Sequence, residues 1–176
     1  IGTPYFSTLQ YFEKVTKDVA SMVFACTENE ANRFGIFLSE TLSLLHHWRS
    51  DKKVYARACE PKPGFSVSFS NPESARATYA EFAKVSFKWH YRLVKSFVTC
   101  LESKEYLEIR NALIILSKVV AHFPILKRAG QVIREAVDKL ATTEKRKDLK
   151  VLASSYLGML EHNKANMISE AEFKNE

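Results

Sequence analysis

Apolar residues recur at intervals of three and four along most of the chain, a spacing that places side chains on one face of an α-helix. The stretch from Ser7 to Cys26 follows this pattern, and so does the stretch from Phe82 to Cys100. The pattern predicts seven helices: 7–26, 28–48, a short one between Asp51 and Pro61, 78–101, 104–122, 124–141 and 148–162. We therefore expect an all-α fold.

Several predicted helices begin with a capping pattern, in which Ser or Thr is followed three residues later by Gln or Glu. The pairs are Ser7 with Gln10, Thr27 with Glu30, and Thr78 with Glu81. The pair at Thr27 follows directly on the first predicted helix, so we expect a tight corner there. Pro124 suits the first turn of the sixth helix, where a missing amide hydrogen costs nothing.

Short corners between helices predict antiparallel pairs packed side by side, as in an α-solenoid of the HEAT/ARM type. Two of the predicted helices, 28–48 and 104–122, carry apolar residues over more surface than one neighbour can cover. We expect one helical scaffold domain at 1–165 with a proline-containing loop at about 60–77, followed by a C-terminal extension at 166–176.

The chain contains only five glycines, whereas a typical chain of this length would contain about twelve. Gly35, Gly130 and Gly158 fall inside predicted helices, which indicates close helix packing at these points. The chain has no phosphate-binding glycine loop, no nucleophile elbow and no metalloprotease motif. We expect neither an enzyme nor a cofactor; a hydrolase whose catalytic residues lie far apart in sequence is the enzyme alternative that stays open.

The three cysteines, Cys26, Cys59 and Cys100, are far apart in the sequence. This spacing fits neither a disulfide framework nor a zinc site, and it favours a reducing compartment. The longest apolar run, 112–116, is far below the roughly 18 residues that a membrane-spanning helix needs, so we expect no membrane contact. The chain does not begin with methionine, and we expect it to be a piece of a longer protein.

The formal net charge is +6, and the positive charge is concentrated in residues 49–98 and 110–150. In the first block, Lys84, Lys88, Arg92 and Lys95 share one helix face; in the second, Lys145, Arg146, Lys147 and Lys150 surround the start of the last predicted helix. Both sets are candidate contacts for nucleic acid or an acidic partner. The alternative for the first set is a helix face that contacts only solvent. The alternative for the second set is an ordinary helix corner. No aromatic RNA-binding pattern accompanies either set, so sequence-specific recognition is not predicted.

Polar residues also occur inside the predicted helices, namely Asn29, Asn32, Arg33, Arg110 and Asn111. Two interpretations stay open for them. They can form hydrogen bonds at helix corners, or they can contact a partner.

Several long segments resemble the C-terminal helical region of the largest subunit of the THO complex. They are CTENEANRFGIFLSETL (26–42), KWHYRLVKSFVTCLESKEYLEIRNALIILSKV (88–119), Phe123-Pro124 and KRKDLKVLA (145–153). The segments occur in the same order as in that family and extend over nearly the whole chain.

This resemblance implies a nuclear scaffold rather than an enzyme. Members of the family hold the THO assembly together, recruit a DEAD-box RNA helicase, and couple transcription to the packaging and nuclear export of messenger RNA. The partners it implies are other THO complex subunits and that helicase, and the family offers no catalytic residues to transfer. A basic helical module that binds RNA is the alternative function.

Overall fold

The structure is a computed structural model that describes residues 6–68, 71 and 74–174. The outer ends of the predicted domain and extension, 1–5 and 175–176, lie outside the described residues, as do 69–70 and 72–73 of the predicted loop.

The described residues form helices and no β-strand, so the all-α prediction is confirmed. In chain order the elements are α1 (Thr8–Lys17), α2 (Val19–Ala25), α3 (Glu28–Ser50), α4 (Lys52–Ala58), the 3-10 helix η1 (Pro63–Phe65), α5 (Tyr79–Leu101), α6 (Tyr106–Val119), α7 (Lys127–Thr143), α8 (Lys147–Asn163), the 3-10 helix η2 (Lys164–Asn166) and α9 (Glu170–Lys174).

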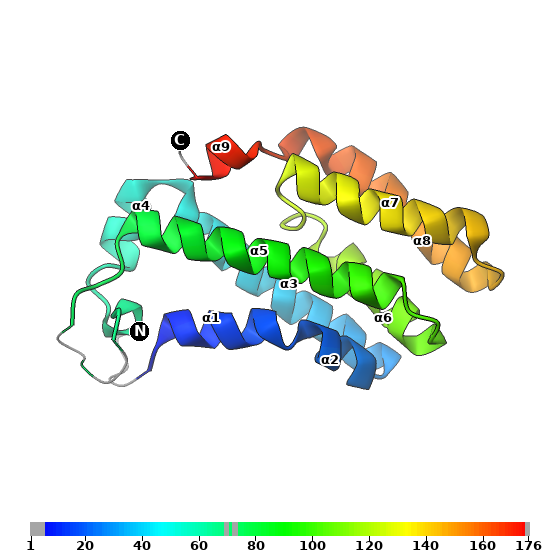
Figure 1. The fold of residues 1–176 in the computed structure, drawn as a ribbon, viewed down its shortest axis with the longest axis horizontal. Coiled ribbons are helices and arrows are strands. Elements are labelled where there is room, and N and C mark those ends of the chain that lie inside the picture. Colours follow the sequence, from blue (N-terminus) through cyan, green and yellow to red (C-terminus); the bar gives the residue numbers. More distant parts are fainter. Residues whose placement is uncertain (1–5, 69–70, 72–73, 175–176) are drawn as a thin grey trace.

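Helix α5 lies at the centre of the molecule (Figure 1). It contacts α1 and α2 on one side and α7 and α9 on the other, and it also packs against α3 and α6. The most extensive helix contacts join α3 to α6 and α7 to α8. None of the helices in the described part of the chain is both long enough and apolar enough to cross a membrane.

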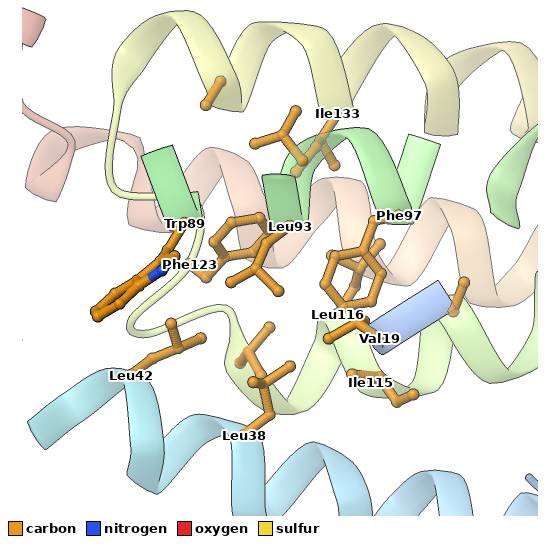
Figure 2. Packing of buried hydrophobic residues seen from close by; sticks show 14 of the residues in the cluster. Val19, Leu38, Leu42, Trp89, Leu93, Phe97, Ile115, Leu116, Phe123 and Ile133 are labelled. Carbon is orange, nitrogen blue, oxygen red and sulfur yellow. The ribbon is translucent and has the colours of Figure 1, made fainter. Parts of the chain in front are cut away.

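The apolar stripe predicted on α5 forms the middle of the core. Figure 2 shows Trp89 and Leu93 directed towards Leu38 and Leu42 of α3, with Phe97 further along α5. All five side chains are buried. Burying apolar surface stabilises the fold by roughly 25 cal/mol per Å², so the pattern that predicted these helices also explains why they pack together.

The predicted caps are present in the structure. The side chains of Thr27 and Thr78 accept hydrogen bonds from the amides of Glu30 and Glu81, whose carboxylates accept from the cap amides in return. Ser7 Oγ accepts a hydrogen bond from the Gln10 amide at 3.2 Å.

The prediction of one continuous helix over residues 7–26 was wrong. The chain leaves helical geometry at Asp18, which ends α1 and precedes α2. The break changes what the chain packs against: α1 contacts η1 and α5, whereas α2 contacts α5 and α6.

The predicted start of the sixth helix at Pro124 was also wrong. Helix α7 begins at Lys127, and the Phe123-Pro124 peptide bond is cis. The Ile168 amide donates to the Ile125 carbonyl at 2.9 Å, and the Lys127 amide donates to the Ile168 carbonyl at 3.0 Å. These two bonds hold the chain in a short extended bridge just where the helix was expected to begin.

Close packing around helical glycines is confirmed at two positions. A methyl group on Gly35 would lie 2.9 Å from Lys118 Cβ in α6, and one on Gly130 would lie 2.6 Å from Met167 Sδ. At Gly158 the prediction was wrong, because no atom lies within 4 Å of an added methyl group.

The segment after residue 165 packs against the helical body. Met167 and Phe173 are buried, and α9 contacts α5. The amide of Ser169 and the carboxylate of Glu172 form a capping interaction at 2.6 Å that starts α9.

Candidate functional site

Three of the four basic residues predicted on α5 point outward. Lys84, Lys88 and Lys95 are exposed, on the face opposite the buried stripe of Trp89 and Leu93. The helix period produces this arrangement, because residues spaced by four, four and three share one face. The structure therefore presents three lysines in a row to solvent.

Arg92, the fourth residue of that set, is engaged inside the protein. Its guanidinium forms an ion pair with Glu13 Oε1 of α1 at 2.7 Å and donates to the Glu13 carbonyl at 3.3 Å. Trp89 Nε1 donates to the other Glu13 carboxylate oxygen at 2.6 Å. Arg92 therefore links α5 to α1 through its contacts with Glu13.

These interactions act on the pKa of Glu13. Partial burial raises this pKa, but the hydrogen bonds from Arg92 and Trp89, with the positive charge of Arg92, outweigh that effect and leave the pKa below its ordinary value. Glu13 is therefore ionised at neutral pH and serves as the anchor of the α1–α5 contact. No local sequence pattern could have revealed it, because Glu13 and Trp89 are 76 residues apart.

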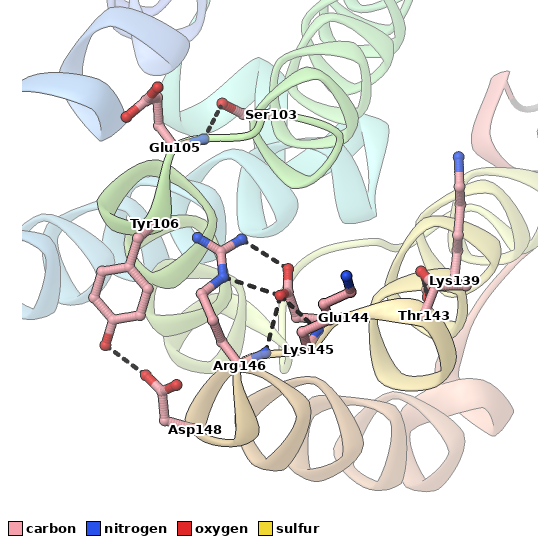
Figure 3. A network of polar contacts seen from close by, with 9 residues as sticks. All are labelled: Ser103, Glu105, Tyr106, Lys139, Thr143, Glu144, Lys145, Arg146 and Asp148. Atoms are coloured by element: carbon pink, nitrogen blue, oxygen red, sulfur yellow. Dashed lines mark hydrogen bonds and ion pairs between the residues drawn. The ribbon is translucent and has the colours of Figure 1, made fainter.

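The second basic set surrounds the corner between α7 and α8, where Figure 3 shows its members Lys145 and Arg146. Arg146 donates through Nε and an Nη to the two carboxylate oxygens of Glu144, at 3.0 and 2.7 Å. This side-chain pairing is the main cause that lowers the pKa of Glu144 to about 2. Lys145 and Lys147 are exposed, whereas Lys150 is half-buried with its Nζ 3.5 Å from the Thr142 carbonyl.

The same corner is connected to the start of α6. The Tyr106 hydroxyl donates to Asp148 Oδ2 at 2.5 Å, and the guanidinium of Arg146 lies 5.6 Å from the centre of the Tyr106 ring. Asp148 is in the first turn of α8, where a negative charge is favourable. Arg146 therefore contributes to the α6–α8 junction, and Lys145 and Lys147 are the residues of this set that face solvent.

In the described part of the chain, no hydrogen bond or ion pair joins the two basic sets. The first lies along α5 and the second at the α7–α8 corner. Sequence reasoning grouped these residues by charge and spacing, but it could not tell the exposed lysines from the arginines that pair internally.

The polar residues inside the helices mostly serve helix corners and helix pairs. Asn111 Nδ2 donates to the carbonyls of Val23 and Cys26 at 3.1 and 2.6 Å, and Arg110 pairs with Glu28 at 2.7 Å. Asn32 donates to the Glu28 carbonyl at 3.0 Å. The hydrogen-bond interpretation is confirmed for these three residues. Asn29 and Arg33 are exposed, and for them partner contact stays a prediction.

Two histidines and two cysteines in the interior are held in their neutral forms. Burial, followed by repulsion from nearby cations, lowers the pKa of His46 to about 4 and that of His90 to about 3. Burial also raises the thiol pKa of Cys59 and Cys100 to about 12, which makes both poor nucleophiles. Within the described residues, no group of three or more His, Cys, Asp or Glu side chains is arranged to hold a metal.

Comparison with known proteins identifies close similarities over the whole chain. Residues 1–160 match the sequence profile of the Tho2 family, described as "Transcription factor/nuclear export subunit protein 2". The chain is 40% identical to THO complex subunit 2 of Arabidopsis thaliana over 98% of its length, and 41% identical to the human protein of that name over 97%. The Saccharomyces cerevisiae protein of the same name is 23% identical over 87% of the chain.

These relatives are much longer proteins. The matched region makes up 10% of the Arabidopsis protein, 11% of the human one and 8% of the yeast one. The chain thus spans about a tenth of the length of the relatives that it matches.

Proposed function

Because the chain belongs to the THO complex subunit 2 family, we propose that it is a non-catalytic scaffold segment of a nuclear THO complex. In this role it supports assembly with other THO subunits and with a DEAD-box RNA helicase, for the packaging of messenger RNA during transcription and its export. The proposal assigns no catalytic residue and no cofactor to the chain.

The proposed architecture is one helical block of an α-solenoid, located in the C-terminal part of the longer protein. Residues 1–165 form the block and 166–176 its extension, which docks through Met167 and Phe173. Helices α7 and α8 support the pairing that we infer, since they are joined by a short corner and pack against one another (Figure 1).

The observation that carries this proposal is an exposed apolar face on α3. One side of α3 packs against α6, while Ile36, Phe37 and Leu44 are 54%, 42% and 42% exposed. Large apolar side chains grouped on one exposed helix face are typical of an interaction surface. Since the relatives are about ten times longer than the chain, we propose that further helices of the same polypeptide cover this face.

The experiment replaces all three residues in the full-length protein, as Ile36→Glu, Phe37→Glu and Leu44→Glu. We expect this variant to recover less of the other THO subunits and of the helicase on affinity purification, because the acidic side chains cannot be buried against neighbouring helices. The control is Val151→Glu, which places a single glutamate on an exposed apolar position of α8. Recovery of every partner at the level of the parent protein would contradict the proposal.

A second candidate function is RNA binding through the outward lysines. It is favoured by the row formed by Lys84, Lys88 and Lys95, with Lys145 and Lys147 as a separate group at the α7–α8 corner. Arg92, Arg146 and Lys150 belong to the same predicted sets but have internal partners, so we expect them to contribute less.

This second function predicts binding to single-stranded RNA that weakens steeply with salt, because bound phosphates release counterions. Reversal of Lys84, Lys88 and Lys95 to Glu should reduce the slope of log K against log salt by roughly 2. Reversal of the exposed Lys52, Lys53 and Lys62 changes the net charge equally and serves as the control. Equal slopes in the two triple variants would exclude a specific role for the α5 row.

A further inference from the structure

A groove of about 260 Å³ lies between the first half of α7 and the end of α8. Its floor is formed by Gly130, Leu160 and Met167, and its rim carries three cations, Lys127, Arg134 and Lys164. Ligand pockets for whole small molecules are usually about 300–1,000 Å³. This groove is smaller, so it suits one or two side chains of a bound peptide.

The floor is apolar and adaptable. Gly130 lets the Met167 side chain pack directly on α7, since a methyl group there would lie 2.6 Å from Met167 Sδ and 3.0 Å from Met167 Cε. Leu160 and Met167 are buried and belong to the hydrophobic core. Methionine side chains are flexible and polarisable, and they are frequent on surfaces that accept varied apolar partners.

The rim has an excess of positive charge. Its acidic residue, Glu161, accepts from Arg134 at 2.9 Å and pairs with Lys164 at 3.0 Å. The hydrogen bond from Lys164 and the charges of Lys164 and Arg134 outweigh desolvation and lower the pKa of Glu161. Lys127 has no ion pair within the described residues, although its charge adds to the hydrogen bonds from Ser169 that chiefly lower the pKa of Glu172.

Glu161 shows where a carboxylate fits on this rim. The side chains of Arg134, Glu161 and Lys164 are all about half exposed, and ion pairs of this kind exchange readily with other anions because water already screens them. An incoming carboxylate can therefore use the same two cations, with Lys127 as a third.

We propose that this groove binds a short acidic segment of a partner protein, with an apolar side chain on the floor and flanking carboxylates on the rim cations. A nucleic acid backbone would satisfy the rim but leave the floor uncovered, so the apolar floor favours a peptide. The proposal goes beyond the scaffold role and stands independently of it.

The test uses the 176-residue chain labelled with ¹⁵N and also at its methionine methyl groups, of which there are three. The probe is a synthetic peptide with a central leucine pair flanked by glutamates, and a matched peptide carries lysines in place of the glutamates. On addition of the acidic peptide, we expect the Met167 methyl signal and the Gly130 amide signal to shift and saturate. The Met22 and Met159 signals should stay unchanged.

The rim is tested with the double variant Lys127→Glu and Lys164→Glu, in which we expect about tenfold weaker binding of the acidic peptide. The control is Lys139→Glu with Lys147→Glu, which makes the same charge change at the opposite ends of α7 and α8. The floor is tested with the variant Gln131→Trp. Gln131 is an exposed residue of the groove lining, and a tryptophan at this position should block access to the floor. Thermal unfolding confirms that each variant is folded.

Three results would overturn the proposal. These are equal binding of both peptides, equal affinity in the rim and control variants, or shifts produced by single-stranded RNA at the groove and by neither peptide. If the peptide binds as expected while the full-length protein recovers no THO subunit, the scaffold proposal fails and the groove proposal stands.

Discussion

Asn111 of α6 donates a hydrogen bond to the carbonyl oxygen of Cys26, at 2.6 Å, across 85 residues of sequence. The same amide group donates to the Val23 carbonyl at 3.1 Å. Both carbonyls belong to the end of α2, where helix carbonyls lack partners within the helix. One buried side chain therefore satisfies the end of one helix and fixes its position against another.

We predict that Asn111→Ala lowers the free energy of unfolding by about 1–3 kcal/mol, because it leaves two carbonyls without their donor at a buried site. Urea denaturation followed by circular dichroism measures the change. Asn29→Ala, at an exposed position of α3, is the matched control and should stay within about 0.5 kcal/mol of the parent. Equal stability of the two variants would show that the α2 end finds other donors.

The two glycines Gly35 and Gly158 should respond in opposite ways to substitution by alanine. At Gly35 the new methyl group would lie 2.9 Å from Lys118 Cβ and 3.3 Å from the Ile115 backbone. We expect Gly35→Ala to destabilise the protein by about 1–3 kcal/mol, since overpacking moves α3 away from α6.

Gly158→Ala meets no atom within 4 Å. It should stabilise the protein by about 0.5–1 kcal/mol, because alanine is the better helix former. Urea unfolding of both variants, side by side, measures the sign directly. A stabilising effect at Gly35 would mean that the α3–α6 contact can widen at no cost.

The sequence was sufficient to predict most helices because their apolar stripes and caps are local signals. The buried stripe of α5 and the Thr78–Glu81 cap both follow from residues that are close in the chain. The Ser169–Glu172 pair carries the same capping signal, but it stands before only five helical residues. So short a helix is not stable by itself and forms because Phe173 is buried against other helices.

Distant contacts explain what local patterns could not predict. The break at Asp18 and the late start of α7 depend on packing against α6 and on the bridge to Ile168. In the sequence, Arg92 has the same spacing and charge as Lys84, Lys88 and Lys95. Only the fold brings Glu13 next to it and shows that Arg92 is paired internally. Charge spacing therefore identified the basic sets, whereas the division into exposed and internally paired residues required the fold.

Helix α9 should depend on Phe173. Its ring lies under the guanidinium of Arg49 at 4.1 Å, and Arg49 donates to the Phe173 carbonyl at 3.2 Å. We expect Phe173→Ala to remove about 3–5 kcal/mol of packing free energy. A helix of five residues is not stable without this packing. Helix α9 should therefore detach while the rest of the helices stay folded.

Hydrogen exchange measures this effect as a loss of protection confined to residues 169–174. The control is Lys174→Ala, also on α9, which removes a cation lying 4.8 Å from the Phe87 ring of α5. It should leave the protection of residues 169–174 nearly unchanged. Loss of protection throughout α3 and α5 would instead show that the extension and the helical body unfold together.

The contact between Glu13 and Arg92 should make the free energy of unfolding depend on pH below about 4.5. The folded state lowers the pKa of this carboxyl below its ordinary value of 4.5, so the ionised form is stabilised by folding. Its contribution is therefore complete above pH 4.5 and is lost as the pH falls through the lowered value. Glu13→Gln removes this proton-linked contribution, and its stability should change less over that range.

The measurement is urea unfolding of parent and Glu13→Gln at a series of pH values between neutral and acid, followed by tryptophan fluorescence. We expect the parent to be the more stable protein at neutral pH, and the difference to shrink once the pH drops below 4.5. Other carboxylates with lowered pKa values, such as Glu144, titrate in both proteins and cancel in the comparison. Equal stability of the two proteins at every pH would show that Glu13 acts through its hydrogen bond to Trp89, which glutamine can still accept, and not through its charge.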